Sequence, residues 1–225
     1  MIKIGHRGAM GYAPENTLIS FKKALDLRVD MIELDVYVCK TGELVVIHDD
    51  KVDRTTNGKG WVTEMTFEEL RSLDAGQGEK IPTFEEVFNL ADEKTKINVE
   101  LKGPETAKPV LSLIDNYVSS KRFSYDDFLI SSFDHHELVK AKKINPDIKI
   151  GALITGVPID YAKFGQDLGA YSVNLCREFI NQEFVDDAHK KGLKVLVWTV
   201  NDHDEIKRMK DLGVDGIFSN FPDRL

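Results

Sequence analysis

Short apolar runs alternate along the chain with longer segments in which apolar residues recur at helical spacing. Two such segments lie at 180–190 and 204–212, and Gly192 and Gly213 stand where each helix would end in a left-handed cap. Strands that alternate with helices predict right-handed βαβ units and a parallel sheet. The runs that we expect to be strands lie at 2–5, 31–36, 97–101, 128–132, 148–153, 171–175, 194–200 and 215–219. Eight such units in one chain predict an α/β protein with a closed (β/α)8 TIM barrel.

A ninth apolar run, at 44–48, breaks this alternation. It follows the second predicted strand after only a short turn, CKTGE. Because a parallel crossover needs about a dozen residues or more, this pair should be an antiparallel hairpin. With the turn centred near Thr41 and Gly42, His48 returns to a position opposite residues 34 and 35.

The segment at about 49–82 is rich in glycine and aspartate and contains one short helical stretch. It predicts a small insertion after the second strand, and it is a candidate cap over one mouth of the barrel. The rest of the sequence has no low-complexity tract, no linker and no second core. One (β/α)8 barrel can use a chain of 225 residues, so we expect a single domain over 1–225.

Charge and cysteine content argue against several classes of protein. The net charge of −8 and the pI of about 5.3 disfavour a broad binding surface for nucleic acid. Cys39 and Cys176 are too few for a disulfide framework or a thiolate zinc site. No apolar run approaches the ~18 residues of a membrane helix, so we expect no membrane span. The N-terminal stretch MIKIGHRG lacks the features of a signal peptide, which predicts a cytoplasmic protein.

Three acidic residues lie inside predicted barrel strands. Glu33 and Asp35 are two positions apart and share one face of a strand, as do Glu100 and Lys102. Acids in buried strands are costly unless something pairs with them. They could be surface acids at strand ends that pair with lysine or arginine. The set as a whole favours a cation site, which with three carboxylates suits Mg²⁺ or Ca²⁺; Mn²⁺ is also possible, and zinc fits less well.

Two histidines follow predicted strands. His6 ends the first strand in GHRG, and His48 ends the hairpin strand in VVIHDD. The carboxyl ends of barrel strands meet at one mouth, which would bring both imidazoles beside the proposed ion. They are therefore a plausible acid–base pair, although a structural hydrogen bond would explain either one alone. We expect the other histidines to be surface residues; they are His135, His136, His189 and His203.

Four further residues have two interpretations each. Arg7 could grip a phosphate oxygen or form an ion pair with one of the acids, and Lys102 could do the same as a point charge. Phe133 and Trp198 also lie near strand ends. They could form an apolar wall for the carbon skeleton of a substrate, or pack in the core.

The stretch GYAPENT after the first strand suits the start of a helix. Pro14 fits a first helical turn and Glu15 its positive end. We therefore expect Glu15 and Asn16 to be structural rather than catalytic.

Together these motifs resemble the glycerophosphodiester phosphodiesterase family, and the match runs along nearly the full chain. The matching stretches are HRGAMGYAPENT (6–17), IELDV (32–36), VVIHDD (45–50), VDRTTNGKG (52–60), IPTFEEV (81–87), VELK (99–102), SSFD (131–134), WTVN (198–201) and VDGIFSNFPD (214–223). The order of these motifs is far more specific than any one of them. The resemblance implies a (β/α)8 barrel with a small insertion after the second strand, in agreement with the apolar pattern.

The resemblance also implies roles for individual residues. Those that fall on the family's functional positions are Glu33, Asp35 and Glu100 as metal ligands, His6 and His48 as the acid–base pair, and Arg7 and Lys102 as phosphate contacts. Met10 stands where many members have Ser, and CKTG replaces the commoner TKDG at the hairpin turn. Neither touches a proposed catalytic group. FSNFPD at 218–223, where the family often has TDxP, looks like a conservative change near the mouth.

The activity implied by this resemblance is divalent-metal-dependent cleavage of glycerophosphodiesters to an alcohol and sn-glycerol 3-phosphate. One histidine would take a proton from the nucleophile while the other gives one to the leaving oxygen. The nucleophile is either water or the glycerol 2-hydroxyl of the substrate, which would form a cyclic phosphate that water then opens. The partner is a small-molecule diester, and both a monomer and a homodimer are compatible with the sequence.

Two alternative functions differ in their sequence requirements. A lysophospholipase D-like enzyme would act on lysophospholipids or sphingolipids and needs an apolar mouth for an acyl chain, whereas the insertion begins with the polar run DDKVDRTTNGKG. A non-catalytic phosphate-binding barrel should lack at least one of the two histidines or three acids, and this chain keeps all five.

Overall fold

A computed structural model describes residues 1–92 and 95–225 of the chain. In these ranges eight parallel strands close into a barrel, because β1 pairs with both β2 and β9. The barrel strands are β1 (Ile2–Gly5), β2 (Met31–Val38), β4 (Lys96–Leu101), β5 (Phe128–Ser132), β6 (Lys149–Ile154), β7 (Ser172–Cys176), β8 (Lys194–Trp198) and β9 (Gly216–Ser219). The predicted (β/α)8 TIM barrel is confirmed, with one additional strand.

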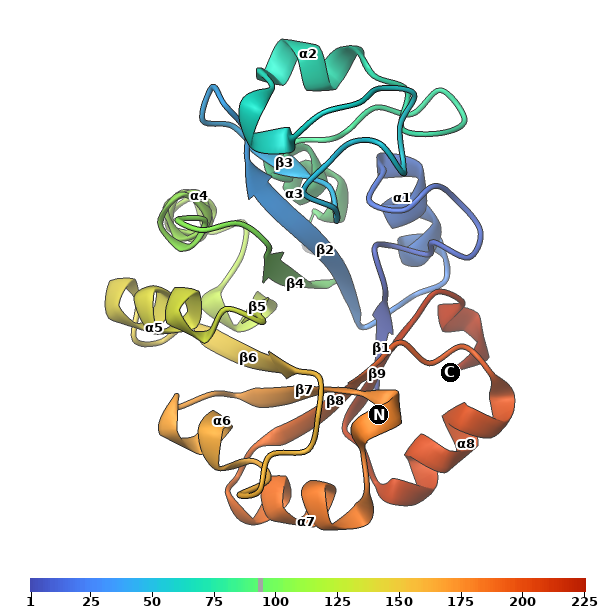
Figure 1. Cartoon of the computed structure of the whole chain (residues 1–225), viewed down its shortest axis with the longest axis vertical. Helices are drawn as coiled ribbons and strands as arrows, with labels where there is room; N and C mark the ends of the chain where they lie inside the picture. The colour runs from blue at the N-terminus through green and yellow to red at the C-terminus, as the bar shows by residue number, and fades with distance from the viewer. Residues whose placement is uncertain (93–94) are drawn as a thin grey trace.

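Helices surround the strands on the outside of the barrel (Figure 1). They are α1 (Leu18–Asp26), α3 (Phe84–Ala91), α4 (Ala107–Ser119), α5 (His135–Ile144), α6 (Lys163–Asp167), α7 (Gln182–Lys190) and α8 (His203–Leu212). Several begin at a polar residue whose side chain accepts a hydrogen bond from the first turn, as Thr17, Asn181 and Asp202 do. Helix α8 ends at Gly213, which has the predicted left-handed conformation.

The additional strand, β3 (Leu44–Val46), forms the predicted antiparallel hairpin with β2. Val36 lies opposite Val46, and the backbone N–H of Ile47 donates to the carbonyl of Asp35 at 3.0 Å. Continuing this register places His48 opposite residue 34, in agreement with the position expected from the turn.

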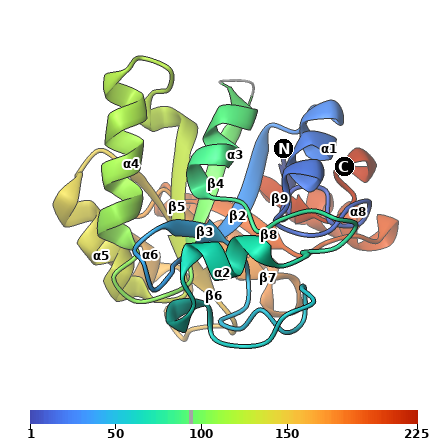
Figure 2. The same ribbon diagram turned by 90° about the horizontal axis from the view of Figure 1, so that it is seen from above.

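The insertion between β3 and α3 contains the 3₁₀ turn η1 (Val62–Glu64) and α2 (Phe67–Ser72). It has a hydrophobic cluster of its own with the hairpin, formed by Tyr37, Cys39, Val45, Ile47, Val52, Val62, Leu70, Ala75 and Ile81. It lies over the hairpin at one edge of the molecule in Figure 1, and Figure 2 shows α2 in front of β3. The insertion therefore packs on one side of the barrel rather than across its centre.

Polar and apolar residues inside the barrel follow the two-residue period of the strands. Met31 and Leu129 belong to a small buried apolar cluster at the start of β2 and β5. Glu33 and Ser131, two positions further along the same strands, are buried polar residues. The barrel is thus apolar where the strands begin and polar toward their carboxyl ends.

Within the described part of the chain, the helices are too short or too polar to cross a membrane.

Candidate functional site

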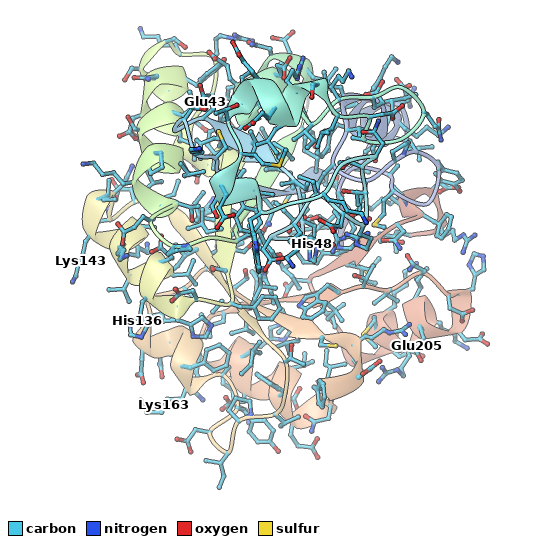
Figure 3. All side chains as sticks on the ribbon, turned by 45° about the horizontal axis from the view of Figure 1, so that its top comes forward. Glu43, His48, His136, Lys143, Lys163 and Glu205 are labelled. Atoms are coloured by element: carbon cyan, nitrogen blue, oxygen red, sulfur yellow. The ribbon has the colours of Figure 1, made fainter. Side chains whose placement is uncertain are left out.

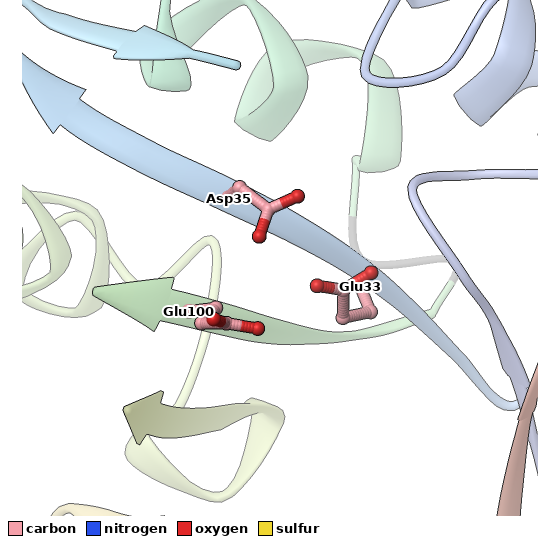
Figure 4. A group of neighbouring side chains, drawn as sticks. All are labelled: Glu33, Asp35 and Glu100. Carbon is pink, nitrogen blue, oxygen red and sulfur yellow. The ribbon is translucent and has the colours of Figure 1, made fainter. Parts of the chain in front are cut away.

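The predicted acids lie on two neighbouring strands, and their carboxylates point toward one another (Figure 4). Glu33 and Asp35 lie on β2, and Glu100 lies on β4 directly opposite Asp35 in the strand register. One carboxylate oxygen from each lies within 4.8 Å of the other two. Glu33 is 3% exposed and Asp35 is fully buried, so water screens their charges poorly.

Burial and mutual repulsion disfavour charge on Glu33 and Glu100. Burial, followed by the charges of Asp35 and Glu100, raises the pKa of Glu33 well above its ordinary value. Burial and the charge of Asp35 raise the pKa of Glu100 to about 7. Among the described residues, the Oδ1 atom of Asp35 is buried without a hydrogen-bond partner. Three converging carboxylates with this unpartnered oxygen among them fit a hard divalent cation.

Two cationic side chains flank the carboxylates. The Nη1 atom of Arg7 donates to Glu15 at 2.7 Å, and its Nε atom lies 3.4 Å from Asp35 Oδ2. The backbone N–H of Arg7 donates to Glu33 at 2.8 Å. Lys102 Nζ lies 2.7 Å from Glu100 and 3.9 Å from Asp35. Both side chains therefore form the ion pairs that were one of the two sequence interpretations, in positions that border the proposed cation site.

Each predicted catalytic histidine has its Nδ1 atom held by a neighbouring oxygen. His6 Nδ1 lies 2.7 Å from Asn220 Oδ1, and His48 Nδ1 lies 2.5 Å from Asp49 Oδ1. Donation from Nδ1 leaves Nε2 as the acceptor of each neutral ring. His48 Nε2 is 3.3 Å from Lys102 Nζ. In Figure 3 His48 lies in the middle of the molecule, whereas Lys143 and Lys163 project from its edge.

The two imidazoles differ in their electrostatic surroundings. Burial, followed by the charge of Arg7, lowers the pKa of His6 to about 4. The partner of His6 is an uncharged amide, whereas the partner of His48 is a carboxylate. Hydrogen bonds from Arg54 hold the pKa of Asp49 far below its ordinary value. His6 is therefore neutral at neutral pH, and His48 faces a permanent negative charge.

A cavity of about 110 Å³ joins these groups. Its lining includes most of the predicted site residues, namely His6, Arg7, Glu33, His48, Glu100, Phe133 and Trp198. Asp35 and Lys102 contact this set through Arg7 and Glu100. Phe133 and Trp198 form an edge-to-face pair with ring centroids 5.5 Å apart. Phe133 is 47% exposed, so at this position the interpretation as a wall of the site fits better than core packing.

The loop after β1 differs from the expectation for GYAPENT. Helix α1 begins at Leu18 with Thr17 as its cap, so Pro14 lies in a loop before the helix and not in its first turn. The reason is that Asn16 adopts φ +57° and its Nδ2 donates to Asp35 Oδ2 at 2.8 Å. The Asn16 side chain therefore supports a proposed metal ligand.

Four residues of the site were not recognised as site residues in the sequence. Glu15 pairs with Arg7 and Arg54, Asp49 binds His48, and Asn220 binds His6. Asn220 belongs to FSNFPD, where the family often has TDxP. This difference from the family pattern therefore touches a proposed catalytic group. An aspartate directly after His48 was a usable signal, whereas Arg54 and Asn220 reach the site only through the folding of distant segments.

Comparison with known proteins points to one family along nearly the whole chain. Residues 6–224 match the glycerophosphoryl diester phosphodiesterase family. A glycerophosphodiester phosphodiesterase of Caldanaerobacter subterraneus subsp. tengcongensis is 40% identical over 235 residues, covering 99% of this chain and 95% of the relative. One of Bacillus altitudinis is 39% identical over 242 residues, covering 100% and 96%. An Oleispira antarctica phosphodiesterase, solved in complex with the product sn-glycerol-3-phosphate, is 32% identical with a TM-score of 0.89, covering 98% of this chain and 93% of that one.

Proposed function

The chain belongs to the glycerophosphoryl diester phosphodiesterase family, a family of phosphoric diester hydrolases, and on this premise we propose that it cleaves glycerophosphodiesters to an alcohol and sn-glycerol 3-phosphate. We further propose that the reaction depends on a divalent cation and on two histidines. One observation carries the proposal: two of the three carboxylates, both imidazoles and Arg7 line one cavity of about 110 Å³, and Asp35 and Lys102 contact this lining.

Glu33, Asp35 and Glu100 are the residues that would hold the cation. Their converging oxygens, and the unpartnered Oδ1 of Asp35 among the described residues, support Mg²⁺, Ca²⁺ or Mn²⁺ over softer metals. When bound, such an ion supplies positive charge that polarises a phosphoryl oxygen and offsets charge developing in the transition state.

Arg7 and Lys102 are proposed to bind the phosphate. Both border the carboxylates, and Arg7 and Lys102 are only 13% and 15% exposed, so their charges act in a poorly screened environment. The fork of Arg7 suits two oxygens of one phosphate, and Lys102 adds a point charge on the side of His48.

His6 and His48 are proposed to transfer protons through Nε2. His6 is neutral at neutral pH, so it is suited to take the proton of the attacking hydroxyl. The Asp49 carboxylate accepts a hydrogen bond from His48 Nδ1 and orients the ring, and His48 is proposed to protonate the leaving oxygen as the phosphorus–oxygen bond breaks. The attacking oxygen forms the new bond to phosphorus, and the leaving oxygen departs with the proton from His48.

The attacking oxygen is either water or the glycerol 2-hydroxyl of the substrate. Attack by the 2-hydroxyl would give a cyclic phosphate, which water opens in a second step with the two histidines in exchanged roles. Such an intramolecular route benefits from high effective concentration and would restrict the enzyme to substrates with a glycerol moiety. Phe133 and Trp198 support a wall against the carbon skeleton of that substrate.

The test is the release of glycerol 3-phosphate from glycerophosphocholine. Purified protein is stripped with chelator and assayed with Mg²⁺, Ca²⁺, Mn²⁺ or no ion, beside His6→Ala. His136→Ala is the matched control, because His136 is exposed on α5 away from the cavity. We expect ion-dependent release that His6→Ala abolishes and His136→Ala retains. Release without any ion contradicts the metal proposal, and release from lysophospholipids alone would favour the lipid-directed alternative.

A further inference from the structure

Arg54, which lies in the insertion, binds two carboxylates from different parts of the chain. Its Nε and Nη2 atoms donate to the two oxygens of Asp49 at 2.7 and 2.9 Å. Its Nη1 and Nη2 atoms donate to the two oxygens of Glu15 at 2.8 and 2.7 Å. One guanidinium therefore joins the residue after His48 to the loop after β1.

Each of these carboxylates holds a group of the proposed site. Asp49 accepts a hydrogen bond from His48 Nδ1, and Glu15 accepts one from Arg7 Nη1 at 2.7 Å. Burial alone would favour a neutral Glu15, but hydrogen bonds from Arg54 and the charge of Arg7 outweigh it and lower its pKa to about 2. Both carboxylates are thus ionised at neutral pH and remain strong acceptors.

We propose that Arg54 is a positioning residue. Through Asp49 it orients His48, and through Glu15 it orients Arg7. It thereby fixes a proton-transfer group and a phosphate-binding group relative to one another. This inference rests on the proposed function of those two residues. It gives the insertion a role in the reaction, although Arg54 itself does not line the cavity.

The chemistry of the contact requires arginine. Four donated hydrogen bonds to two carboxylates need a planar fork with donors along two edges, which a lysine ammonium does not provide. Arg54 is 49% exposed, and ion pairs at such exposure contribute only about 0–1 kcal/mol to stability. Its removal should therefore affect turnover far more than folding.

The experiment compares Arg54→Ala and Arg54→Lys with Arg71→Ala. Arg71 is a matched control, because it lies in the same insertion, binds Glu86 through two hydrogen bonds of 2.7 and 2.6 Å, and has a similar exposure of 36%. We measure kcat and KM for glycerophosphocholine with saturating Mn²⁺, together with Tm. Misplacement of reacting groups by about 1 Å can cost about 100-fold in rate.

We expect Arg54→Ala to lower kcat about 10- to 100-fold with a smaller change in KM, and Arg54→Lys to recover little of it. Arg71→Ala should keep kcat within about twofold while lowering Tm at least as much as Arg54→Ala does. Guanidinium ions added to Arg54→Ala should restore part of the lost kcat. Unchanged kcat in Arg54→Ala overturns the inference, as does an equal loss in Arg71→Ala.

A second readout does not depend on activity. Two-bond ¹H–¹⁵N spectra of the histidine rings report which nitrogen carries the proton. In the wild type we expect neutral His48 to carry it on Nδ1, and in Arg54→Ala we expect a mixture of both tautomers. Identical His48 spectra in the two proteins contradict the role of Arg54 whatever the assay gives, whereas a wild type that is inactive with every ion contradicts the proposed function alone.

Discussion

The Nδ1 atom of His6 lies 2.7 Å from the Oδ1 atom of Asn220, across 214 positions of the chain. Pairing of β1 with β9 brings them together, and the backbone N–H of His6 also donates to the carbonyl of Ser219. The amide orients the ring without offering a negative charge. Because FSNFPD here replaces a pattern that often contains an aspartate, His6 is less basic in this chain than it would be beside a carboxylate.

Replacing Asn220 by aspartate should raise the pKa of His6. The pKa of His6 is lowered to about 4 by burial and by Arg7, and an opposite charge within about 4–6 Å typically raises a histidine pKa by about one to three pH units. NMR titration of the histidine rings in chelator-treated protein measures this directly. Asn145→Asp, which adds the same charge after α5, is the control and should leave the His6 midpoint unchanged.

His6 should also make the metal-free protein less stable in mild acid. The pKa of His6 is about 4 in the folded protein and about 6.5 in the unfolded chain, so over this window the unfolded chain binds the extra proton. Stability due to neutral His6 is complete above pH 6.5 and is lost as the pH falls toward 4. The free energy of unfolding of wild type relative to His6→Gln should fall by about 1–3 kcal/mol between pH 7 and pH 4. A difference that stays constant with pH would contradict this.

Glu33→Gln should stabilise the chelator-treated protein and remove its response to metal. Glu33 is buried beside the charges of Asp35 and Glu100, and its pKa is raised for that reason. A glutamine oxygen can still accept the backbone N–H of Arg7, which lies 2.8 Å away. We expect a higher Tm in chelator by the equivalent of about 1 kcal/mol, and no rise in Tm with Mn²⁺. The wild type should have the lower Tm in chelator, and its Tm should rise when Mn²⁺ is added.

His48→Ala should lower kcat by about 10²–10⁴-fold, the usual contribution of general acid–base catalysis. Asp49→Asn should lower kcat less, because it keeps a hydrogen-bond acceptor near Nδ1 but removes the negative charge. His203→Ala, in the first turn of α8, is the control and should keep wild-type turnover. A His48→Ala enzyme with normal kcat would remove His48 from the proposed mechanism.

Phe88→Ala should destabilise the protein without altering the site. Phe88 on α3 stacks on Tyr117 with centroids 4.5 Å apart and contacts Phe128 of β5 at 5.3 Å. Removing a buried phenylalanine side chain costs about 3–5 kcal/mol. Denaturant unfolding should show this loss, while Mn²⁺ affinity of the folded protein stays the same. Phe133→Ala removes an exposed ring, so it should raise KM for glycerophosphocholine with little loss of stability.

Periodicity was sufficient to predict the barrel and the position of its acids. A two-residue period places Glu33 and Asp35 on one face of a strand whatever the details of packing, and a short turn fixes the register that brings back His48. Both inferences depend on local geometry alone. The structure agrees with them in the pairing of Asp35 with Glu100 and of Val36 with Val46.

The residues that support the site lie in loops, and the conformation of these loops is set by tertiary contacts. Asn16 leaves the helical region because Asp35 offers its side chain a buried partner, which no local pattern reveals. Arg54 lies 39 positions from Glu15, and Asn220 lies still further from His6. A polar loop residue has many possible partners, so the sequence alone does not single out the one that the fold supplies.

The closure of the barrel by β1 and β9 also makes one proposed catalytic group depend on a contact between distant parts of the chain. His6 directly follows β1, whereas Asn220, whose amide orients it, comes 214 positions later, directly after the flanking strand β9. Contacts of such long sequence separation form late, because the chain entropy they remove must first be offset by other contacts. A chain in which β9 has not paired with β1 lacks the partner that orients His6, so we expect activity to arise only once β9 docks.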